Sequence, residues 1–373
     1  MKKRLDSLDA LRGFDLFCLV ALSLLIKDLA HAANNPWMNT IKMFFRHKEW
    51  DGFSTWDLVM PLFMFMAGTT IPYSLSKYRD GAEKKALYWR IGRRVLLLWI
   101  LGMIVQGNLL ALDPQRIYLF TNTLQAIAVG WLFSALIFLH TNWRTQIGIA
   151  IGLLITFWAA MEFVTIGNYG GGDYTPHGNL AEGIDMLLLG RFRDTATIIN
   201  GEVVVKASYT YTWILSSLNF VVTVLTGVFA GEILKSQIKQ RSKVILLGCV
   251  GLAMVVLGWI WNIWHPVIKH IWTSSMVLVS SGYCFLLMAL FYYWIDCRGH
   301  NRHLTFLKVD GMNSITAYVV SHIISFSSIS KSLFFGLEQY AGNYYDLIIC
   351  LSNVSILFIL LYILYRNKIF LRV

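Results

Sequence analysis

The chain consists of long apolar runs separated by mostly short polar connections. An α-helix needs about 20 predominantly apolar residues to cross a bilayer. By this measure we predict ten membrane-spanning helices, at residues 10–32, 53–76, 91–110, 121–140, 145–165, 212–234, 243–263, 271–296, 311–329 and 346–365. Because only helices and closed barrels satisfy every backbone polar group in lipid, the pattern predicts an all-α polytopic integral membrane bundle of about ten transmembrane helices.

The composition supports this class of protein. Hydrophobic residues make up 56% of the 373 residues, the mean hydropathy is +0.56 and only 14% of residues are charged, against about 25% in soluble proteins. We therefore expect a single membrane domain over 1–373 and no separate soluble domain. The five cysteines are scattered in or beside the spans without metal-ligand spacing, so we expect neither a metal site nor a disulfide framework.

The distribution of Lys and Arg predicts the orientation in the membrane. An even number of spans puts both termini on one side, and that side receives most of the 32 Lys and Arg residues. By the positive-inside rule both termini are cytoplasmic, and His47 lies on the outer side. The net charge of +11 then belongs mainly to the inner membrane surface. We expect no nucleic-acid partner, because such a partner needs a basic patch on a folded soluble domain.

A long outer loop is predicted at about 166–211, rich in Gly, Asn and Tyr. A loop of this length without a span of its own is usually functional or disordered. Its aromatic and amide side chains suit contacts with sugars, and an ordinary solvated cap fits the residue types equally well.

Ionisable residues within spans are costly, so each one marks either an ion pair or a functional site. Near the inner end of the first span, Asp9, Arg12 and Asp15 follow one another at intervals of three residues. Arg12 can therefore pair with either carboxylate and fix the helix register, or it can face an anionic ligand.

The stretch "KYRDGAEKKALYWRIGRR" at 77–94 supplies seven cations on the cytoplasmic side. Arg90, Arg93 and Arg94 share one face of a predicted helix, because their spacing is i, i+3, i+4. Such a run usually serves only as a topology signal. As a ligand site it would suit phosphates.

A polar cluster directly precedes the second span, in "FFRHKEWDGFSTWDLVMPLFMFMAG" at 44–68. It contains His47, Trp50, Asp51 and Asp57. A histidine beside a tryptophan at the membrane surface is often a headgroup anchor. The other interpretation is a catalytic site.

Two later stretches, "HPVIKHIWTSS" and "GMNSITAYVVSH", carry further polar residues at the outer end of a span or within one. Each can be explained by hydrogen bonds between helices in lipid. Together they indicate a polar pocket near the outer surface, and the residues concerned are Lys269, Trp272, Thr273, Ser274 and Asn313.

The same stretches carry a family resemblance. The segments "SLDALRGFD", "HKEWDGFSTWDLVMPLFMFMAG", "GNLAEGIDMLLLG", "LTGVFAGEIL", "HPVIKHIWTSS" and "GMNSITAY" resemble, in the same order, signature segments of the heparan-α-glucosaminide N-acetyltransferase family and its bacterial relatives, part of the transmembrane acyltransferase group. The resemblance runs from about residue 4 to about residue 325. Its His-x-x-Trp-x-Gly and Lys-x-x-Trp-Thr-Ser elements are fairly specific.

The resemblance implies transfer of acetyl from cytoplasmic acetyl-CoA to the amine of a terminal glucosamine on the far side of the membrane. By motif position His47 is the catalytic residue. The membrane implied is a bacterial inner membrane with the His47 loop on the periplasmic side. Expected partners are acetyl-CoA, an amino-sugar or glycan acceptor, the lipid bilayer and, as one alternative, a second copy of the chain in a homodimer.

The residue chemistry is compatible with this reaction. An amine must lose a proton to attack a thioester, and an imidazole with a reference pKa of about 6.5 can accept it. His47 either acts as this base or is itself acetylated and passes the group on. Asp51 or Asp57 could orient the imidazole, and Lys269 or Asn313 could stabilise the oxyanion.

Acceptor contacts are expected from Trp50, Trp272, Thr273 and Ser274, and donor contacts from Arg12, Arg90, Arg93, Arg94 and Asn313. Two other functions stay open. An O-acetyltransferase of a cell-envelope polysaccharide would use the same donor and base. A secondary transporter would also show charges and Gly or Pro breaks within its spans, although no internal repeat is evident.

Overall fold

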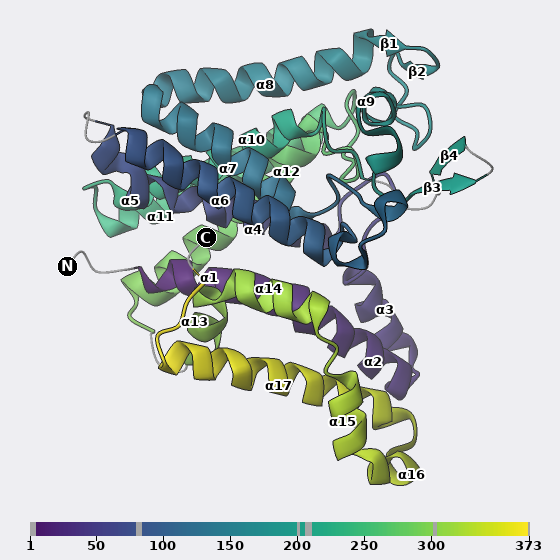
Figure 1. Cartoon of the computed structure of the whole chain (residues 1–373). Coiled ribbons are helices and arrows are strands. Elements are labelled where there is room, and N and C mark those ends of the chain that lie inside the picture. The colour runs from purple at the N-terminus through teal and green to yellow at the C-terminus, as the bar shows by residue number, and fades with distance from the viewer. Residues whose placement is uncertain (1–4, 80–83, 200–201, 206–210, 301–303, 372–373) are drawn as a thin grey trace. The chain divides into compact units, whose positions relative to one another are not determined.

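The computed structural model describes residues 5–79, 84–199, 202–205, 211–300 and 304–371. These residues are predominantly helical, and their only strands form two short antiparallel hairpins. The chain divides into two compact units, which Figure 1 draws together although their relative placement is not determined. The predicted all-α polytopic class is confirmed.

Unit 1 comprises residues 1–47, 54–59 and 290–372. Its helices are α1 (Asp6–Phe17), α2 (Ser23–Ala33), α3 (Pro36–Phe44), α13 (Thr305–Met312), α14 (Ser314–Ile323), α15 (Ser327–Leu333), α16 (Glu338–Ala341) and α17 (Tyr345–Arg366). A π-helical turn joins α1 to α2 without a break in the helical path, and another follows α12. Helix α17 packs against α2, α13 and α15 (Figure 1).

Unit 2 comprises the described residues of 48–53 and 60–289. Its helices are α4 (Val59–Thr69), α5 (Ile71–Leu75), α6 (Lys84–Val105), α7 (Thr123–His140), α8 (Trp143–Phe163), α9 (Leu180–Leu189), α10 (Ser217–Lys235), α11 (Gln240–Trp261) and α12 (Ser274–Phe291). Helix α10 is buried along most of its length and packs against α5, α7, α8 and α11. The core of unit 2 therefore forms around α10.

Eight helical segments of the described residues are long and apolar enough to cross a bilayer. They correspond to eight of the ten predicted spans, and the chain is an integral membrane protein. The two other predicted spans differ from expectation. Helix α6 has 22 residues, but three arginines lie in its first half. The stretch 311–329 is not one helix, because α13 ends before Asn313 and α14 ends at Ile323.

The predicted outer loop at 166–211 contains secondary structure. The hairpin of β1 (Thr165–Ile166) and β2 (Tyr169–Gly170) opens it, α9 follows, and the hairpin of β3 (Ala196–Ile199) and β4 (Glu202–Val205) comes next. Asn179 begins α9, because its side-chain oxygen accepts the backbone N–H of Glu182 at 2.8 Å. The described part of the segment is thus folded, and we call it the folded cap.

Close helix crossings in both units require glycine. A Cβ atom on Gly13 of α1 would lie 1.8 Å from the carbonyl oxygen of Leu307 on α13. In unit 2, a Cβ on Gly68 of α4 would lie 2.0 Å from the carbonyl oxygen of Val224 on α10. Small residues at such crossings allow backbones in a membrane to approach closely.

We expect Gly68→Ala to destabilise the protein, by about 1–3 kcal/mol or more, because the added methyl overpacks the crossing of α4 and α10. Gly248→Ala on α11 is the matched control, since no atom would lie within 4 Å of its new Cβ. Thermal unfolding in one detergent should show a lowered midpoint for the first variant only. Equal midpoints for the two variants would contradict the close crossing.

Candidate active site

His47 forms a partly buried contact with one of the two predicted carboxylates. Its Nδ1 atom lies 2.7 Å from Oδ1 of Asp57. The Asp57 side chain is 1% exposed, whereas that of His47 is 35% exposed. A carboxylate that accepts the Nδ1–H bond fixes the tautomer in which Nε2 carries the lone pair of the neutral ring. This is the arrangement of an imidazole prepared to accept a proton.

The loop before α4 holds Asp57 in place. Oδ2 of Asp57 accepts the backbone N–H of Ser54 at 2.9 Å and lies 2.9 Å from the Ser54 hydroxyl. Ser54 and Asp57 thereby form a capping box at the helical turn Thr55–Leu58. Trp56 beside it packs with Cys18, Val59 and Phe45. Hydrogen bonds from Ser54 therefore fix the carboxylate, and the neighbouring Trp56 belongs to an apolar cluster.

Asp51 occupies a different position. It is exposed, and its backbone forms an isolated bridge with Ile268. The neighbouring Gly52 N–H donates to the carbonyl of Val267 at 2.8 Å. Asp51 thus belongs to a short pairing that joins the 48–53 segment to the segment before α12 in unit 2.

Trp50 lies in an aromatic stack in unit 2. Its ring stacks on the imidazole of His270 with centroids 5.1 Å apart, and Tyr211 stacks on the same imidazole at 5.0 Å. The indole N–H of Trp50 donates to the carbonyl of Tyr174 at 2.8 Å. The Lys269 ammonium, almost fully buried, lies 5.8 Å from the Tyr211 ring centroid. The predicted Trp50 and Lys269 therefore share one cluster.

Trp272, Thr273 and Ser274 build the turn that carries Lys269. Trp272 has a left-handed φ of 53°, which is uncommon for a bulky residue, and its indole N–H donates to Thr223 Oγ1 at 3.0 Å. The Thr273 hydroxyl accepts the Ile268 N–H at 3.0 Å. All three residues are buried. These contacts fix the conformation of the turn. That the three side chains contact a sugar acceptor stays a prediction.

A chain of hydrogen bonds supports the other end of this turn. His265 Nε2 accepts the backbone N–H of Ser274 at 3.0 Å, so in the neutral ring Nδ1 carries the proton and donates to the Tyr174 hydroxyl at 2.8 Å. Tyr174 in turn donates to Glu162 at 3.1 Å. Burial lowers the pKa of His265 to about 3. The imidazole therefore stays neutral and acts as a positioning residue.

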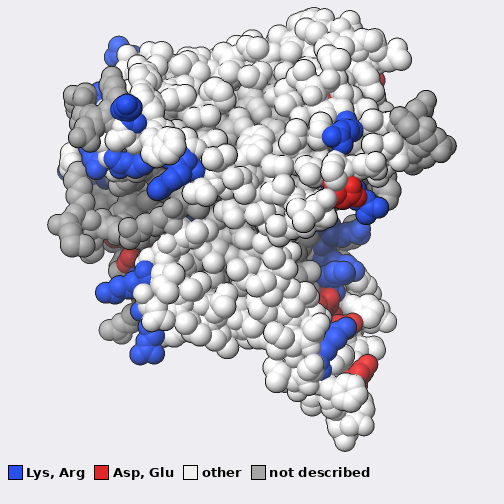
Figure 2. Space-filling model, in the orientation of Figure 1, with Lys and Arg blue, Asp and Glu red and all other residues white. Residues whose placement is uncertain are grey.

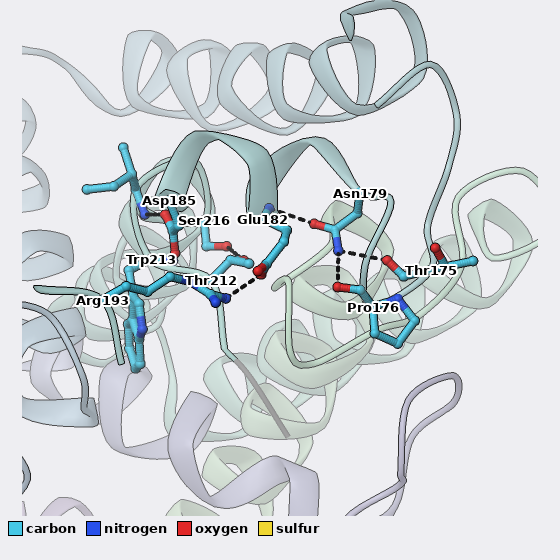
Figure 3. A network of polar contacts seen from close by, with 10 residues as sticks. Thr175, Pro176, Asn179, Glu182, Asp185, Arg193, Thr212, Trp213 and Ser216 are labelled. Atoms are coloured by element: carbon cyan, nitrogen blue, oxygen red, sulfur yellow. Dashed lines mark hydrogen bonds and ion pairs between the residues drawn. The ribbon is translucent and has the colours of Figure 1, made fainter. Parts of the chain in front are cut away.

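The folded cap is fixed by a second polar network, shown in Figure 3. Asp185 on α9 accepts the backbone N–H groups of Trp213 at 2.7 Å and Ile214 at 2.9 Å. Burial raises the pKa of Asp185 to about 7, although these two bonds act in the opposite direction. Glu182 forms a buried ion pair with Arg193. The network ties α9 to the chain just before α10.

The predicted donor residues lie in both units. Arg12 is half-buried on α1 and is near enough to Asp15 to interact electrostatically. Asn313 is buried between α13 and α14, and its side-chain amide has no hydrogen-bond partner among the described residues.

The three arginines of α6 are in unit 2. Arg90 lies 5.5 Å from the Tyr78 ring centroid and Arg94 lies 4.1 Å from that of Trp131, whereas Arg93 is exposed. Figure 2 shows Lys and Arg gathered where α5 ends and α6 begins. This basic end is the expected location for an anionic ligand.

The structure therefore brings together His47 with Asp57 in unit 1, and Trp50 with Lys269 in unit 2. Sequence reasoning missed the supporting residues His265, His270 and Tyr174. A signal for the two histidines was present, because both flank Lys269 within "HPVIKHIWTSS". Tyr174 could not be found in this way, since it is more than 90 residues away along the chain.

Comparison with known proteins finds two curated proteins that are similar to this chain. The chain is 26% identical to heparan-alpha-glucosaminide N-acetyltransferase of Homo sapiens over 427 aligned positions, which cover 98% of this chain and 59% of the human protein. The Mus musculus protein of the same name is also 26% identical, over 86% of this chain and 54% of its own length. The chain is therefore similar to these two acetyltransferases, at a low level of identity.

The resemblance inferred from the motifs is thereby confirmed. The chain spans a little over half the length of the two curated relatives that it matches. No family model matches the chain.

We expect stability to fall in acid because of His265. Its folded-state pKa of about 3 is below the reference value of about 6.5, so its contribution is fully present above pH 6.5 and is lost as the pH falls toward 3. His265→Asn should lower the unfolding temperature at pH 7 and reduce its further decline between pH 7 and pH 4.5.

His322→Asn, which changes an exposed histidine, is the control and should keep the wild-type pH dependence. Unfolding temperatures measured across this pH range for all three proteins provide the test. A wild-type slope in His265→Asn would show that His265 is not the group responsible.

Proposed function

We propose that the chain is a membrane-bound N-acetyltransferase that moves acetyl from cytoplasmic acetyl-CoA to the amine of a glucosamine-type sugar on the outer side. The observation that carries this proposal is the bond between His47 and the buried Asp57. The names of the two relatives support the reaction type. The proposed location is a bacterial inner membrane, with the His47 loop in the periplasm.

The chemistry assigned to His47 is proton transfer. As the sugar amine attacks the thioester carbonyl carbon, a C–N bond forms and the nitrogen loses a proton to Nε2 of His47. When the tetrahedral intermediate collapses, the C–S bond breaks and the imidazolium returns the proton to the leaving thiolate. Asp57 stabilises the imidazolium in between. If His47 instead carries the acetyl group, the same tautomer presents Nε2 as the nucleophile.

Two other groups have the chemistry to assist. Lys269 is buried on a turn held by hydrogen bonds, and we assign to its amino group the stabilisation of the developing oxyanion. The buried amide of Asn313, which lacks a partner among the described residues, suits the amide groups of the pantetheine arm. We assign the nucleotide phosphates to the arginines of α6, of which Arg93 is exposed.

The proposal predicts a graded effect of substitutions at the His47–Asp57 pair. His47→Ala should abolish transfer, with a loss of at least about 10²-fold, because the base or acyl carrier is removed. Asp57→Asn should lower kcat by about 10²-fold or more and change KM little, because an amide does not stabilise the imidazolium.

Transfer of labelled acetyl from acetyl-CoA to glucosamine by the purified protein is the measurement. Asp113→Asn is the control, since Asp113 is a surface residue paired with Arg116 at 3.5 Å and should keep wild-type activity. His47→Ala with more than about a tenth of wild-type activity would exclude a catalytic role.

A further inference from the structure

Unit 1 contains a cavity that the proposed chemistry does not use. Its volume is about 420 Å³, and it lies among α2, the 321–327 stretch, α15 and α17. Helix α17 packs against both α2 and α15 (Figure 1). Ligand-binding pockets typically measure about 300–1,000 Å³. The cavity is therefore large enough for a polar group together with part of an apolar chain.

The cavity is elongated along two antiparallel helical segments. Its lining runs from Val20 to Asp28 on the first segment and from Leu357 back to Asp346 on α17. Asp28 is close to Asp346 and hydrogen-bonded to Cys350, whereas Val20 and Leu357 also line a second, smaller cavity further along. Eleven residues of α17 correspond to about 16 Å of helix axis. The cavity thus extends in the direction in which the acyl chains of a bilayer lie.

The polarity of the lining changes along this length. The far end is lined by aliphatic side chains, namely Val20, Leu24, Val354 and Leu357. The other end is lined by charged and hydroxyl side chains, namely Asp28, Ser325, Ser327, Lys331 and Asp346. This polar end lies near Ala33, where the first span-length segment ends, and at the start of α17. An apolar tunnel with a polar mouth at the end of a span is the lining that a lipid requires.

The polar end carries both signs of charge. Its carboxylates are Asp28 and Asp346, and Lys331 supplies an ammonium group. Lys27 and His31 also act electrostatically on Asp28, so its charge is already partly compensated. In the part of the chain that the structure describes, neither Asp346 nor Lys331 forms an ion pair. Nearly balanced but separate charges favour a zwitterion over a simple cation or anion.

An amide supplies a further donor at this end. The side-chain oxygen of Asn353 accepts the Ser330 hydroxyl at 2.6 Å. The NH₂ group of Asn353 donates to no acceptor among the described residues, and Asn353 lines the cavity. This group can therefore donate to a phosphate oxygen, as can the Lys331 ammonium.

We propose that the cavity binds one molecule of a zwitterionic aminophospholipid, of the phosphatidylethanolamine type. The lipid ammonium lies at Asp28 and Asp346, and the phosphate lies at Lys331 and the Asn353 amide. One acyl chain follows the aliphatic lining toward Leu357. The bound lipid connects α2, α15 and α17, and its binding does not depend on acetyl transfer.

The first test compares lipids on the purified full chain in detergent by native mass spectrometry. Phosphatidylethanolamine should bind wild type, and phosphatidylglycerol with the same acyl chains should bind at least about tenfold more weakly, because it lacks the ammonium. Glycerophosphoethanolamine should not bind measurably, because it lacks the chains. Equal affinity for the two lipids would identify ordinary annular lipid and overturn the proposal, as would the absence of phosphatidylethanolamine binding.

Substitutions at the polar end test the assignment of the headgroup. Asp346→Asn and Lys331→Gln should each weaken phosphatidylethanolamine binding about tenfold. Asp346→Lys should reverse the preference, so that phosphatidylglycerol binds more tightly than phosphatidylethanolamine. Asp346 and Lys331 are both exposed, so these variants should fold. Wild-type affinity in the first two variants, or a retained preference for phosphatidylethanolamine in Asp346→Lys, would overturn the proposal.

Glu338→Lys is the matched control, because it makes the same charge change at an exposed residue of α16 that does not line the cavity. Thermal unfolding of delipidated protein gives a second readout, since a ligand that binds only the native state raises the midpoint. Phosphatidylethanolamine should raise the midpoint of wild type and of Glu338→Lys equally, and that of Asp346→Lys much less. Equal shifts in all three proteins would contradict binding at the cavity.

Discussion

The burial of the Asp57 carboxylate is the constraint on which the candidate site depends. A carboxylate removed from water is stable only if hydrogen bonds or an opposite charge replace the lost solvation. Here Ser54 supplies hydrogen bonds to one oxygen and His47 supplies a ring N–H to the other. The need to replace the lost solvation of Asp57 therefore determines the conformation of the loop before α4 and the tautomer of His47. The property needed for proton transfer therefore follows from a requirement of folding.

The same principle organises the folded cap of unit 2 and the turn that precedes α12. Asp185 and Glu182 are buried on α9, and each is satisfied by groups distant in sequence, the backbone before α10 and the guanidinium of Arg193. His265 is satisfied from both sides of its ring. The hydrogen bonds and the ion pair of these residues fix the conformation of the folded cap and of the turn that carries Lys269.

Much of this architecture can be predicted from the sequence, for definite physical reasons. Apolar runs of about 20 residues predict spans because bilayer thickness fixes their length, and eight of the ten predicted spans have long apolar counterparts. The prediction of one span at 311–329 was wrong, because mean hydropathy does not register the break in the helix at Asn313.

The choice between Asp51 and Asp57 could not be made from the sequence. Both follow His47 within ten residues, and the capping box of Ser54 and Asp57 was the only local signal that distinguished them. The stacking of Trp50 on His270 joins segments over 200 residues apart, and no local pattern encodes such a contact. The polar cluster before the second span singled out His47, and the resemblance of its motif to that of a known family favoured a catalytic role over a headgroup anchor.

The central claim, acetyl transfer across the membrane to an acceptor on the His47 side, is tested most directly in sealed vesicles of known orientation. Labelled acetyl-CoA is supplied only to the Lys- and Arg-rich face, and glucosamine only to the opposite face. The account predicts labelled N-acetylglucosamine on the face that received glucosamine, and none from vesicles carrying His47→Ala. Unmodified glucosamine accumulating on the Lys- and Arg-rich face, independently of acetyl-CoA, would identify a transporter and contradict the account.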